Sequence, residues 1–283
     1  MSKYPLFLAP LALLGLTACS GKDGDDTAAP ADTDTDTDTD TDTDTDTDTD
    51  TDTDTDVETY SVSGTAIDFA TRAPVAEGLC VVAVDPGPAL TGGAPTPIGD
   101  TTVGAAGAFL LADLDTKPGL GLVIIVQDCA AEGTVYATGT GIGSSTLAEL
   151  ADGATLADRT IFSISSAVKD GMVASLGAAG NTWTPDTQGI LMAFVLDNAG
   201  VPIGGATVTG AAATSFYLDT DSADGMFTTG TSINAGTDPA VGLAVLPAAP
   251  ITTYTATATG KTFDTLTGGS FAGMALFVAF YAD

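Results

Sequence analysis

The feature that most limits how this chain folds is a run of twelve consecutive Thr-Asp pairs, from Thr33 to Asp56. The surrounding segment, Ser20 to Glu58, carries sixteen Asp, one Glu and one Lys, and has no large apolar side chain before Val57. Such a segment buries too little apolar surface to offset the entropy lost on ordering, so we expect it to be disordered. The alternation has the period of a strand, but both faces of that strand would be polar.

Repulsion between the Asp side chains favours an extended spacer. A neutral flexible chain of about 39 residues would span roughly 35 Å root mean square, and full extension sets a limit on the order of 130 Å. We therefore predict a disordered acidic stalk over residues 19–58, with a cation-collecting or glycosylated stalk as the alternative. The carboxylates would attract Ca²⁺ only diffusely, because nothing folds them into a cage.

Composition excludes several classes of function. The chain has 37 acidic and 7 basic residues, a net charge of −30, and no histidine. This charge repels nucleic acid and anionic membrane surfaces, so we expect no nucleic-acid partner. The absence of histidine removes imidazole catalysis and most zinc sites.

Residues 1–18 have the pattern of an export signal. Lys3 precedes an apolar run from Tyr4 to Leu14, which is short for a membrane span and is interrupted by two prolines. The residues Leu16-Thr17-Ala18-Cys19 resemble the bacterial lipobox. That resemblance implies cleavage before Cys19 and attachment of acyl chains, such as palmitate, to this residue.

The predicted lipid group on Cys19 gives the chain a membrane partner. Two or three acyl chains form a stable anchor, because each buried CH₂ contributes about 0.8 kcal/mol. Ser20 after the cysteine favours the bacterial outer membrane, with the protein facing the periplasm or the cell surface. An ordinary secretory signal with a chance cysteine is the alternative.

Strand patterns dominate the chain after Tyr60. Short β-branched and apolar runs, such as Val123–Val126 and Met274–Tyr281, are separated by Gly, Pro, Asp and Asn. This pattern predicts a mainly β fold with two small antiparallel β-sandwich domains, at residues 59–158 and 186–283. A helical linker over residues 159–185 is predicted to join them.

The predicted linker helix rests on apolar residues four positions apart, Ile164, Val168, Met172 and Leu176. Ser163 is the expected cap, and Gly177 and Gly180 are the residues expected to end the helix. Gly171 lies within this helix and costs about 1 kcal/mol relative to alanine.

The two β halves share an internal repeat. In the first, Ile67-Asp68 is followed by Pro74-Val75 and then a strand; in the second, Leu196-Asp197 is followed by Pro202-Ile203 and then a strand. Each copy later contains Gly-x-Phe, at Gly107-Ala108-Phe109 and Gly225-Met226-Phe227.

This order resembles the carboxypeptidase regulatory-like domain, a transthyretin-like β-sandwich, over about residues 60–141 and, with less fidelity, 190–283. The resemblance implies an appendage, adhesion unit or spacer rather than an activity, and a related sandwich class includes starch-binding modules. It also implies that the strands beginning at Cys80 and ending at Cys129 are adjacent and antiparallel.

A disulfide between Cys80 and Cys129 follows from this arrangement. Once Cys19 is lipidated, these two cysteines remain as an even pair in an exported protein, where oxidation is permitted. The alternative is two buried free thiols.

One motif raises the question of catalysis. Ser166-Ala167-Val168-Lys169 matches the S-x-x-K signature of penicillin-binding enzymes, in which the serine is the nucleophile. The companion motifs are missing, because Gly260-Lys261-Thr262 is not K-T-G and no S-D-N follows. We therefore predict that the chain is not an enzyme, with a serine-lysine hydrolase as a remote alternative.

An acidic turn is the nearest approach to a metal site. Asp219, Asp221 and Asp224 precede Gly225, but their spacing departs from an EF-hand loop and no Glu follows at its twelfth position. The prediction is a β-turn and no cofactor, with a weak Ca²⁺ site as the alternative. Asp113 and Asp115, near Lys117, are interpreted as another turn.

These observations together predict a lipoprotein that displays non-catalytic structural or adhesive β-sandwich modules, with an unidentified protein or glycan as partner. The main alternative is a carbohydrate-binding envelope module. That alternative requires an exposed aromatic strip, for which Trp183, Tyr217 and Tyr254 are the candidates. For Trp183, the competing role is to pack the linker helix against a domain.

Overall fold

The computed structural model describes residues 58–130, 132–210, 213–218, 227–228, 233 and 243–282. These residues lie within one compact unit, residues 54–283. The predicted export signal, Cys19, the Thr-Asp repeat and the acidic turn at Asp219, Asp221 and Asp224 fall outside the described residues.

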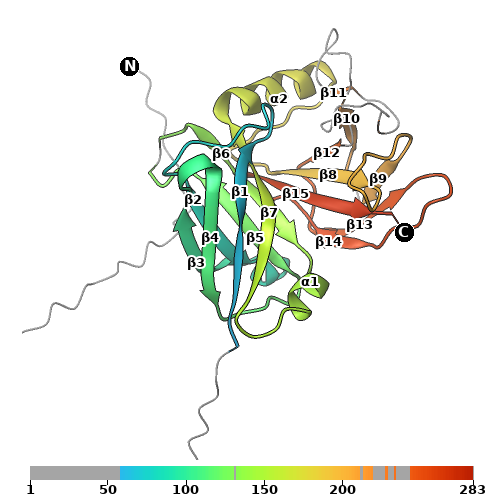
Figure 1. The fold of residues 1–283 in the computed structure, drawn as a ribbon. Helices are drawn as coiled ribbons and strands as arrows, with labels where there is room; N and C mark the ends of the chain where they lie inside the picture. The colour runs from blue at the N-terminus through green and yellow to red at the C-terminus, as the bar shows by residue number, and fades with distance from the viewer. Residues whose placement is uncertain are drawn as a thin grey trace, which may run out of the picture. The chain divides into compact units, whose positions relative to one another are not determined.

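The described residues are mainly β-structure, which confirms the predicted class (Figure 1). The strands are β1 (Tyr60–Asp68), β2 (Cys80–Asp85), β3 (Thr96–Thr102), β4 (Ala108–Leu114), β5 (Leu122–Gln127), β6 (Val135–Ile142), β7 (Ala154–Ser165), β8 (Ile190–Leu196), β9 (Thr207–Gly210), β10 (Phe216–Leu218), β11 (Phe227–Thr228), β12 (Leu243–Pro247), β13 (Thr252–Thr257), β14 (Leu266–Gly268) and β15 (Met274–Tyr281). The α-helices are α1 (Ser144–Ala148) and α2 (Ser166–Ala178), and the short 3₁₀ turns are η1 (Gly87–Thr91) and η2 (Ala105–Gly107).

The first half of the fold packs β1, β4 and β7 against the sheet region formed by β6, β5, β2 and β3. Alternate residues of β1 point into the core between them, including Tyr60 and Val62. They meet Val81 and Ala83 from β2 and Ile124 from β5. Alternation of this kind is the period-two signature of a strand with one buried face.

The second half packs β8, β12 and β15 against a separate three-stranded sheet of order β14-β13-β9. Tyr254 from β13 and Val208 from β9 meet Leu191 and Val195 from β8 in this core. The strands β8, β12 and β15 are apolar on both faces, because α2 and its neighbours cover the opposite face. This double burial explains their nearly continuous apolar sequences.

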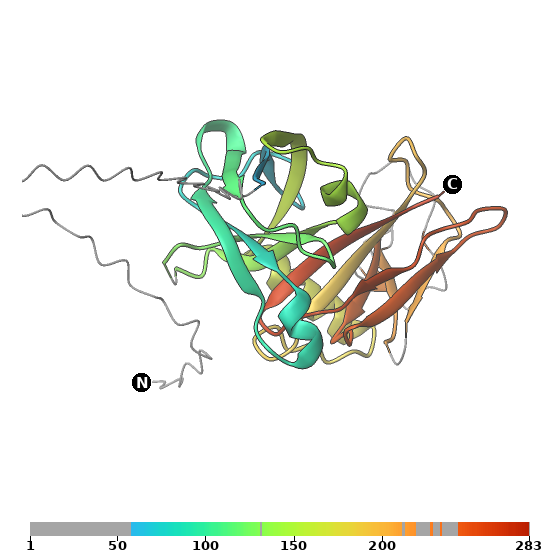
Figure 2. The same cartoon turned by 90° about the horizontal axis from the view of Figure 1, so that it is seen from below.

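Strand β15 joins the two halves into one sheet (Figure 2). It pairs with β8 and with β6, and both pairings are parallel. A third parallel pairing links β1 with β7, so the purely antiparallel pairing expected from the sequence does not hold at these three places. The domain boundaries stay a prediction, but the two sandwiches share a sheet that the internal repeat did not indicate.

Helix α2 begins later than its apolar spacing predicted. Ile164 lies in β7, where its neighbours pair with β1, and the helix starts at Ser166. The cap is Ser165, whose hydroxyl accepts a hydrogen bond from the Val168 N–H, and not Ser163, which is buried within β7. Ile164 and Met172 nevertheless enter the same buried cluster, which explains why the spacing extended across the strand end. Within the described residues, neither helix is long and apolar enough to cross a membrane.

The internal repeat has a matching backbone in its two Asp-Pro turns, residues 68–74 and 197–202. In both, the Asp N–H donates to the carbonyl of the residue before proline, Ala73 or Val201. In both, the Asp carboxylate accepts backbone N–H groups within the turn, and the proline bridges the residue before the aspartate. The short sequence pattern of Asp, Pro and an aliphatic residue therefore specifies two similar turns, of which the first is one residue longer.

Candidate functional site: the stalk junction and a groove between the two halves

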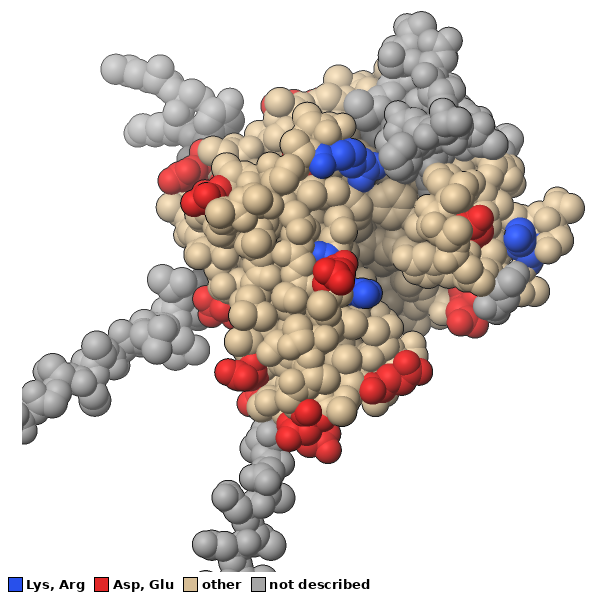
Figure 3. Space-filling view, viewed as in Figure 1, with Lys and Arg blue, Asp and Glu red and all other residues tan. Residues whose placement is uncertain are grey.

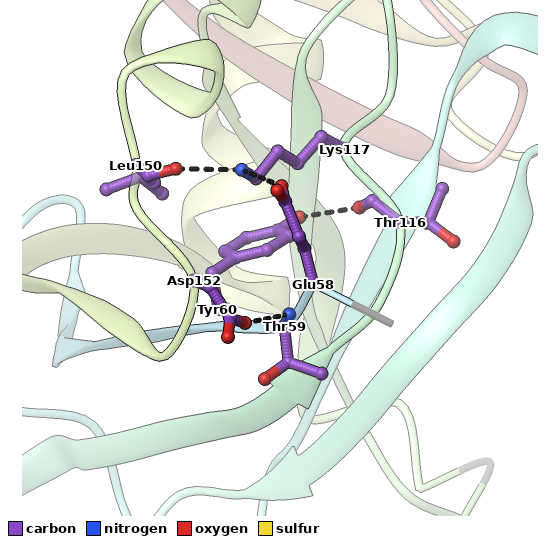
Figure 4. A network of polar contacts seen from close by, with 7 residues as sticks. All are labelled: Glu58, Thr59, Tyr60, Thr116, Lys117, Leu150 and Asp152. Atoms are coloured by element: carbon purple, nitrogen blue, oxygen red, sulfur yellow. Dashed lines mark hydrogen bonds and ion pairs between the residues drawn. The ribbon is translucent and has the colours of Figure 1, made fainter. Parts of the chain in front are cut away.

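The described chain begins at a polar network that fixes its first residues to the first sandwich, which we call the stalk junction (Figure 4). Lys117 Nζ lies 3.5 Å from Glu58 Oε2 and donates to the Leu150 carbonyl at 2.8 Å. The Thr59 N–H donates to Asp152 Oδ1 at 2.8 Å, and the Thr59 carbonyl accepts from the Gly153 N–H. Lys117 therefore links Glu58 to the segment at Leu150, while Asp113, which was interpreted from the sequence as part of a turn, lies near the end of β4.

Tyr60 continues the stalk junction into the core. Its ring is buried, and its hydroxyl donates to the Thr116 carbonyl at 2.8 Å. Burial, together with the negative charge of Asp115, raises the pKa of Tyr60 to about 12. The hydroxyl therefore stays protonated, and keeps its donor role, well above neutral pH.

A groove of about 980 Å³ lies between the two halves, lined by residues of both. Figure 3 shows the hollow at the centre of this view, with a small group of basic and acidic side chains beside it. Its lining includes β7 from Asp158 to Phe162, β15 from Leu276 to Tyr281, and Thr140–Ile142 at the end of β6. The β7–β6 ladder covers only Ile164 and Ser165 at the end of β7, and the preceding residues of β7 line the groove together with the end of β6.

Arg72 contributes a positive charge to this groove from the first Asp-Pro turn. Its guanidinium carbon lies 5.1 Å from the ring centroid of Phe69 and 5.3 Å from that of Phe162, within the range of a cation–π contact. Its backbone has a φ of 59°, in the left-handed region that non-glycine residues rarely adopt. The surrounding structure thus holds Arg72 in a costly conformation over aromatic rings.

A β-bulge in β7 brings Asp158 and Arg159 to the same groove. Val62 pairs with Leu156 and Gly64 with Arg159, so β7 has one more residue than β1 over this stretch. Asp158, in the bulge, has a φ of 58°. A Cβ on Gly64 would lie 1.8 Å from the Arg159 carbonyl oxygen, so the bulge requires glycine there. Bulges of this kind redirect side chains and often lie beside binding sites.

The two S-x-x-K residues take part in local contacts at the start of α2. The Ser166 hydroxyl donates to the Gly133 carbonyl, and Lys169 Nζ lies 3.0 Å from Asp170 Oδ1. These contacts give Ser166 a role in fixing the helix start to the β5–β6 connection.

The aromatic residues considered for sugar binding are part of the core. Trp183, Tyr217 and Tyr254 are all buried, so they do not form the exposed aromatic strip that the carbohydrate-binding alternative requires. The prediction of such a strip is wrong for these three residues. Trp183 packs edge-to-face on the Tyr136 ring and donates to the Gln188 carbonyl. It lies in the cluster that includes Met172 of α2, which is the packing role considered for it in the sequence.

Cys80 and Cys129 are joined by a disulfide in the structure, with their Cα atoms 5.0 Å apart. Beside it, Asp128 closes the β5–β6 connection. Burial raises the pKa of its carboxyl group, but hydrogen bonds from the Thr134 hydroxyl and from the backbone N–H groups of residues 133–135 outweigh this effect. The pKa of Asp128 is therefore lowered below its usual value.

No cluster of three His, Cys, Asp or Glu side chains that could hold a metal is present among the described residues. The weak Ca²⁺ candidates Asp219, Asp221 and Asp224 lie outside that part of the chain, so they stay a prediction. Sequence reasoning missed Arg72, Asp158 and Arg159. Only the positions of Arg72 before a proline and of Gly64 within a strand could have drawn attention to them.

No protein-family model and no curated protein matches the chain. Among solved structures, a shaft pilin SpaA from Lactobacillus rhamnosus GG is 9% identical, with 80% of this chain and 98% of the pilin covered and a TM-score of 0.25. The minor pilin of Streptococcus agalactiae is 11% identical, with coverages of 79% and 95% and a TM-score of 0.22. The Bacillus anthracis TIE protein is 9% identical with a TM-score of 0.27, and the match covers 80% of this chain but only 34% of that one. TM-scores this low do not establish a shared fold.

Proposed function

We propose that this chain is a lipid-anchored, non-catalytic module of the bacterial cell envelope, held away from the outer membrane by its acidic stalk and acting in structure or adhesion. The observation that carries the proposal is the stalk junction. The Thr-Asp repeat ends at Asp56, and Glu58, Thr59 and Tyr60 are each bonded to the folded module.

A tethered module must keep its tethered end folded when it is pulled. Here the chain enters through β1, which is paired with β4 on one side and with β7 on the other. A load directed along β1 therefore has to shear two ladders at once, in addition to breaking the Glu58–Lys117 pair. This arrangement supports a role in which the stalk transmits force between a membrane and a bound partner.

The contacts of Ser166 and Lys169 support a role without catalysis, because both side chains are engaged in local structure at the start of α2. We expect Ser166→Ala and Lys169→Ala to leave the cellular phenotype unchanged. A lost phenotype with an intact fold would instead favour the serine-lysine hydrolase.

Metabolic labelling with a fatty acid tests the anchor. The wild-type chain and a Cys80→Ser control should both take up label, whereas Cys19→Ser should not, because only Cys19 lies in the lipobox-like sequence. Equal labelling of all three would contradict the proposal.

Replacing Thr33–Asp56 by a Gly-Ser stretch of equal length tests the spacer. The stability of the module should not change, while the salt-dependent compaction expected from screening of Asp–Asp repulsion should disappear. Deleting the segment should reduce antibody access on whole cells if the module faces outward. Loss of module stability in the Gly-Ser variant would show that the segment is not a spacer.

A further inference from the structure

Exposed apolar side chains gather at the groove between the two halves. Five large apolar residues are strongly exposed within the described part of the chain. Three of them line the groove: Leu90 at 49% exposure, Leu120 at 40% and Tyr281 at 55%. They come from η1, from the loop before β5 and from the end of β15, so only the fold brings them together. A group of exposed apolar residues around one concave surface is typical of a binding site.

The groove is also bordered by strand edges. Val278–Tyr281 pairs with β8 on one side only, because the β15–β6 ladder ends at Phe277. On the opposite wall, Arg159–Phe162 pairs with β1, and the β7–β6 ladder covers only Ile164 and Ser165. The Phe162 N–H donates to the Thr140 hydroxyl of β6 at 3.3 Å, so the unpaired edge of β7 is residues 159–161. Among the described residues, the strand segment in each wall is therefore paired with a neighbouring strand on one side only, and its other side is unpaired. Such edges accept a further strand.

The charge of the groove differs from that of the remaining surface. Its lining carries two arginines, Arg72 and Arg159, against two aspartates, Asp158 and Asp264. Elsewhere in the described residues, acidic side chains far outnumber basic ones. An acidic ligand is therefore repelled by most of the module and is least disfavoured at the groove.

We propose that the groove binds an extended, acidic segment of a partner protein by β-strand addition. The segment's backbone pairs with the free edge of β15 or β7, its apolar side chains contact Leu90, Leu120 and Tyr281, and an acidic side chain faces Arg159. Two of the three exposed rim residues, Leu90 and Leu120, are aliphatic, and the walls are unpaired strand edges, which match a peptide. A sugar would need a platform of several exposed aromatic faces, whereas Tyr281 is the one aromatic residue among these three. This inference rests on the proposed function and names the chemistry of its partner.

Selection of linear peptides from a phage-displayed library on the full chain tests the proposal. Peptides should be enriched that alternate apolar with polar residues and carry Asp or Glu. They should bind Leu120→Asp and Arg159→Glu at least tenfold more weakly than the wild type in fluorescence anisotropy. The controls are Leu110→Asp and Lys261→Glu, which change another exposed leucine and another exposed cation outside the groove, and binding to them should stay within twofold.

Hydrogen exchange locates the bound peptide. Binding should slow exchange of backbone N–H groups in Val278–Tyr281 or in residues 159–161, and unchanged thermal unfolding of each variant should show that the fold is intact. No enriched peptide, equal weakening in the groove and control variants, or protection elsewhere would overturn the proposal, as would displacement of the peptide by neutral glycans. These measurements in solution do not depend on Cys19, so they can fail while fatty-acid labelling succeeds, and the reverse.

Discussion

The two Asp-Pro turns share the hydrogen bond from the Asp N–H to the residue before proline, although the first turn is one residue longer, and they differ at the residue two positions before proline. Gly200 holds this place in the second turn with a φ of 76°, and Arg72 holds it in the first with a φ of 59°. Glycine adopts this conformation without steric cost, whereas a residue with a Cβ does not. Both residues line the groove. The first turn therefore uses a strained position to place a guanidinium group over Phe69 and Phe162, and the second is only a turn.

The two halves also differ in how they are held together. The first half contains the disulfide and the stalk junction, whereas the described part of the second half depends on its apolar core and on β15. Changes in each half should therefore lower stability by different amounts, and the following measurements test this difference.

The largest effect is expected from removing the disulfide. The bond closes a loop with a sequence separation of 49 residues. In the chain-entropy model, its loss lowers the free energy of unfolding by about 4 kcal/mol. We expect this loss for Cys80→Ser/Cys129→Ser in urea unfolding, with hydrogen exchange accelerated more in β2 and β5 than in β9 and β13. Equal acceleration in both halves would show that the two sandwiches unfold as one unit.

The next effect concerns the Asp residues of the two turns. Asp68→Ala and Asp197→Ala each remove a carboxylate that accepts at least two backbone N–H groups. We expect each substitution to lower the free energy of unfolding by about 1–2 kcal/mol, because hydrogen bonds to a charged group are lost. Similar losses would support equivalence of the turns. A difference of more than about 1 kcal/mol would show that tertiary packing dominates one of them.

A smaller effect is expected at Arg72. Arg72→Gly removes both the backbone strain and the cation–π contacts, so the two changes should cancel to within about 1 kcal/mol. Arg72→Ala keeps the strain and loses the contacts, and should be less stable than Arg72→Gly by about 1 kcal/mol. Gly200→Ala, the matched change in the second turn, should also cost about 1 kcal/mol. Calorimetric unfolding of the three variants measures these differences. Equal stability of the two Arg72 variants would show that the backbone at residue 72 is not strained.

The smallest effect is a pH dependence of the first half. The pKa of Asp128 is lowered in the folded state, so its contribution to stability is present above its unfolded pKa of about 3.9 and is lost as pH falls through the folded value. Asp128→Asn should therefore reduce the slope of stability against pH below about pH 4. Urea unfolding from pH 5 to pH 2.5 measures this slope, with Asp100→Asn as the exposed-carboxylate control. An unchanged slope would show that Asp128 does not contribute to the pH dependence of stability.

Local chemistry made part of this fold predictable. The Asp, Pro and aliphatic spacing identified both turns, and apolar runs identified strands such as β5 and β15. The joining of β6 with β15 was not predictable, because these strands lie far apart in sequence and neither carries a local signal for its partner. The groove was missed for the same reason, because Leu120 and Arg159 of the first half and Tyr281 of the second line one groove only in the folded chain. Ile164 misled the helix prediction because a buried residue at a strand end can satisfy helical spacing.

The central position of β15 also has a kinetic consequence. Ribosomal synthesis delivers this strand after all the strands that it must join, and its parallel ladders connect it to β6, more than a hundred residues earlier in the chain. Contacts so distant in sequence are slow to form, because a large loop must close first. Until β15 arrives, β6 and β8 each keep an unpaired edge that invites aggregation. The order of assembly is thus set by sequence distance. The local turns form early, and the pairing of β15 with β6 and β8 comes last and completes the sheet.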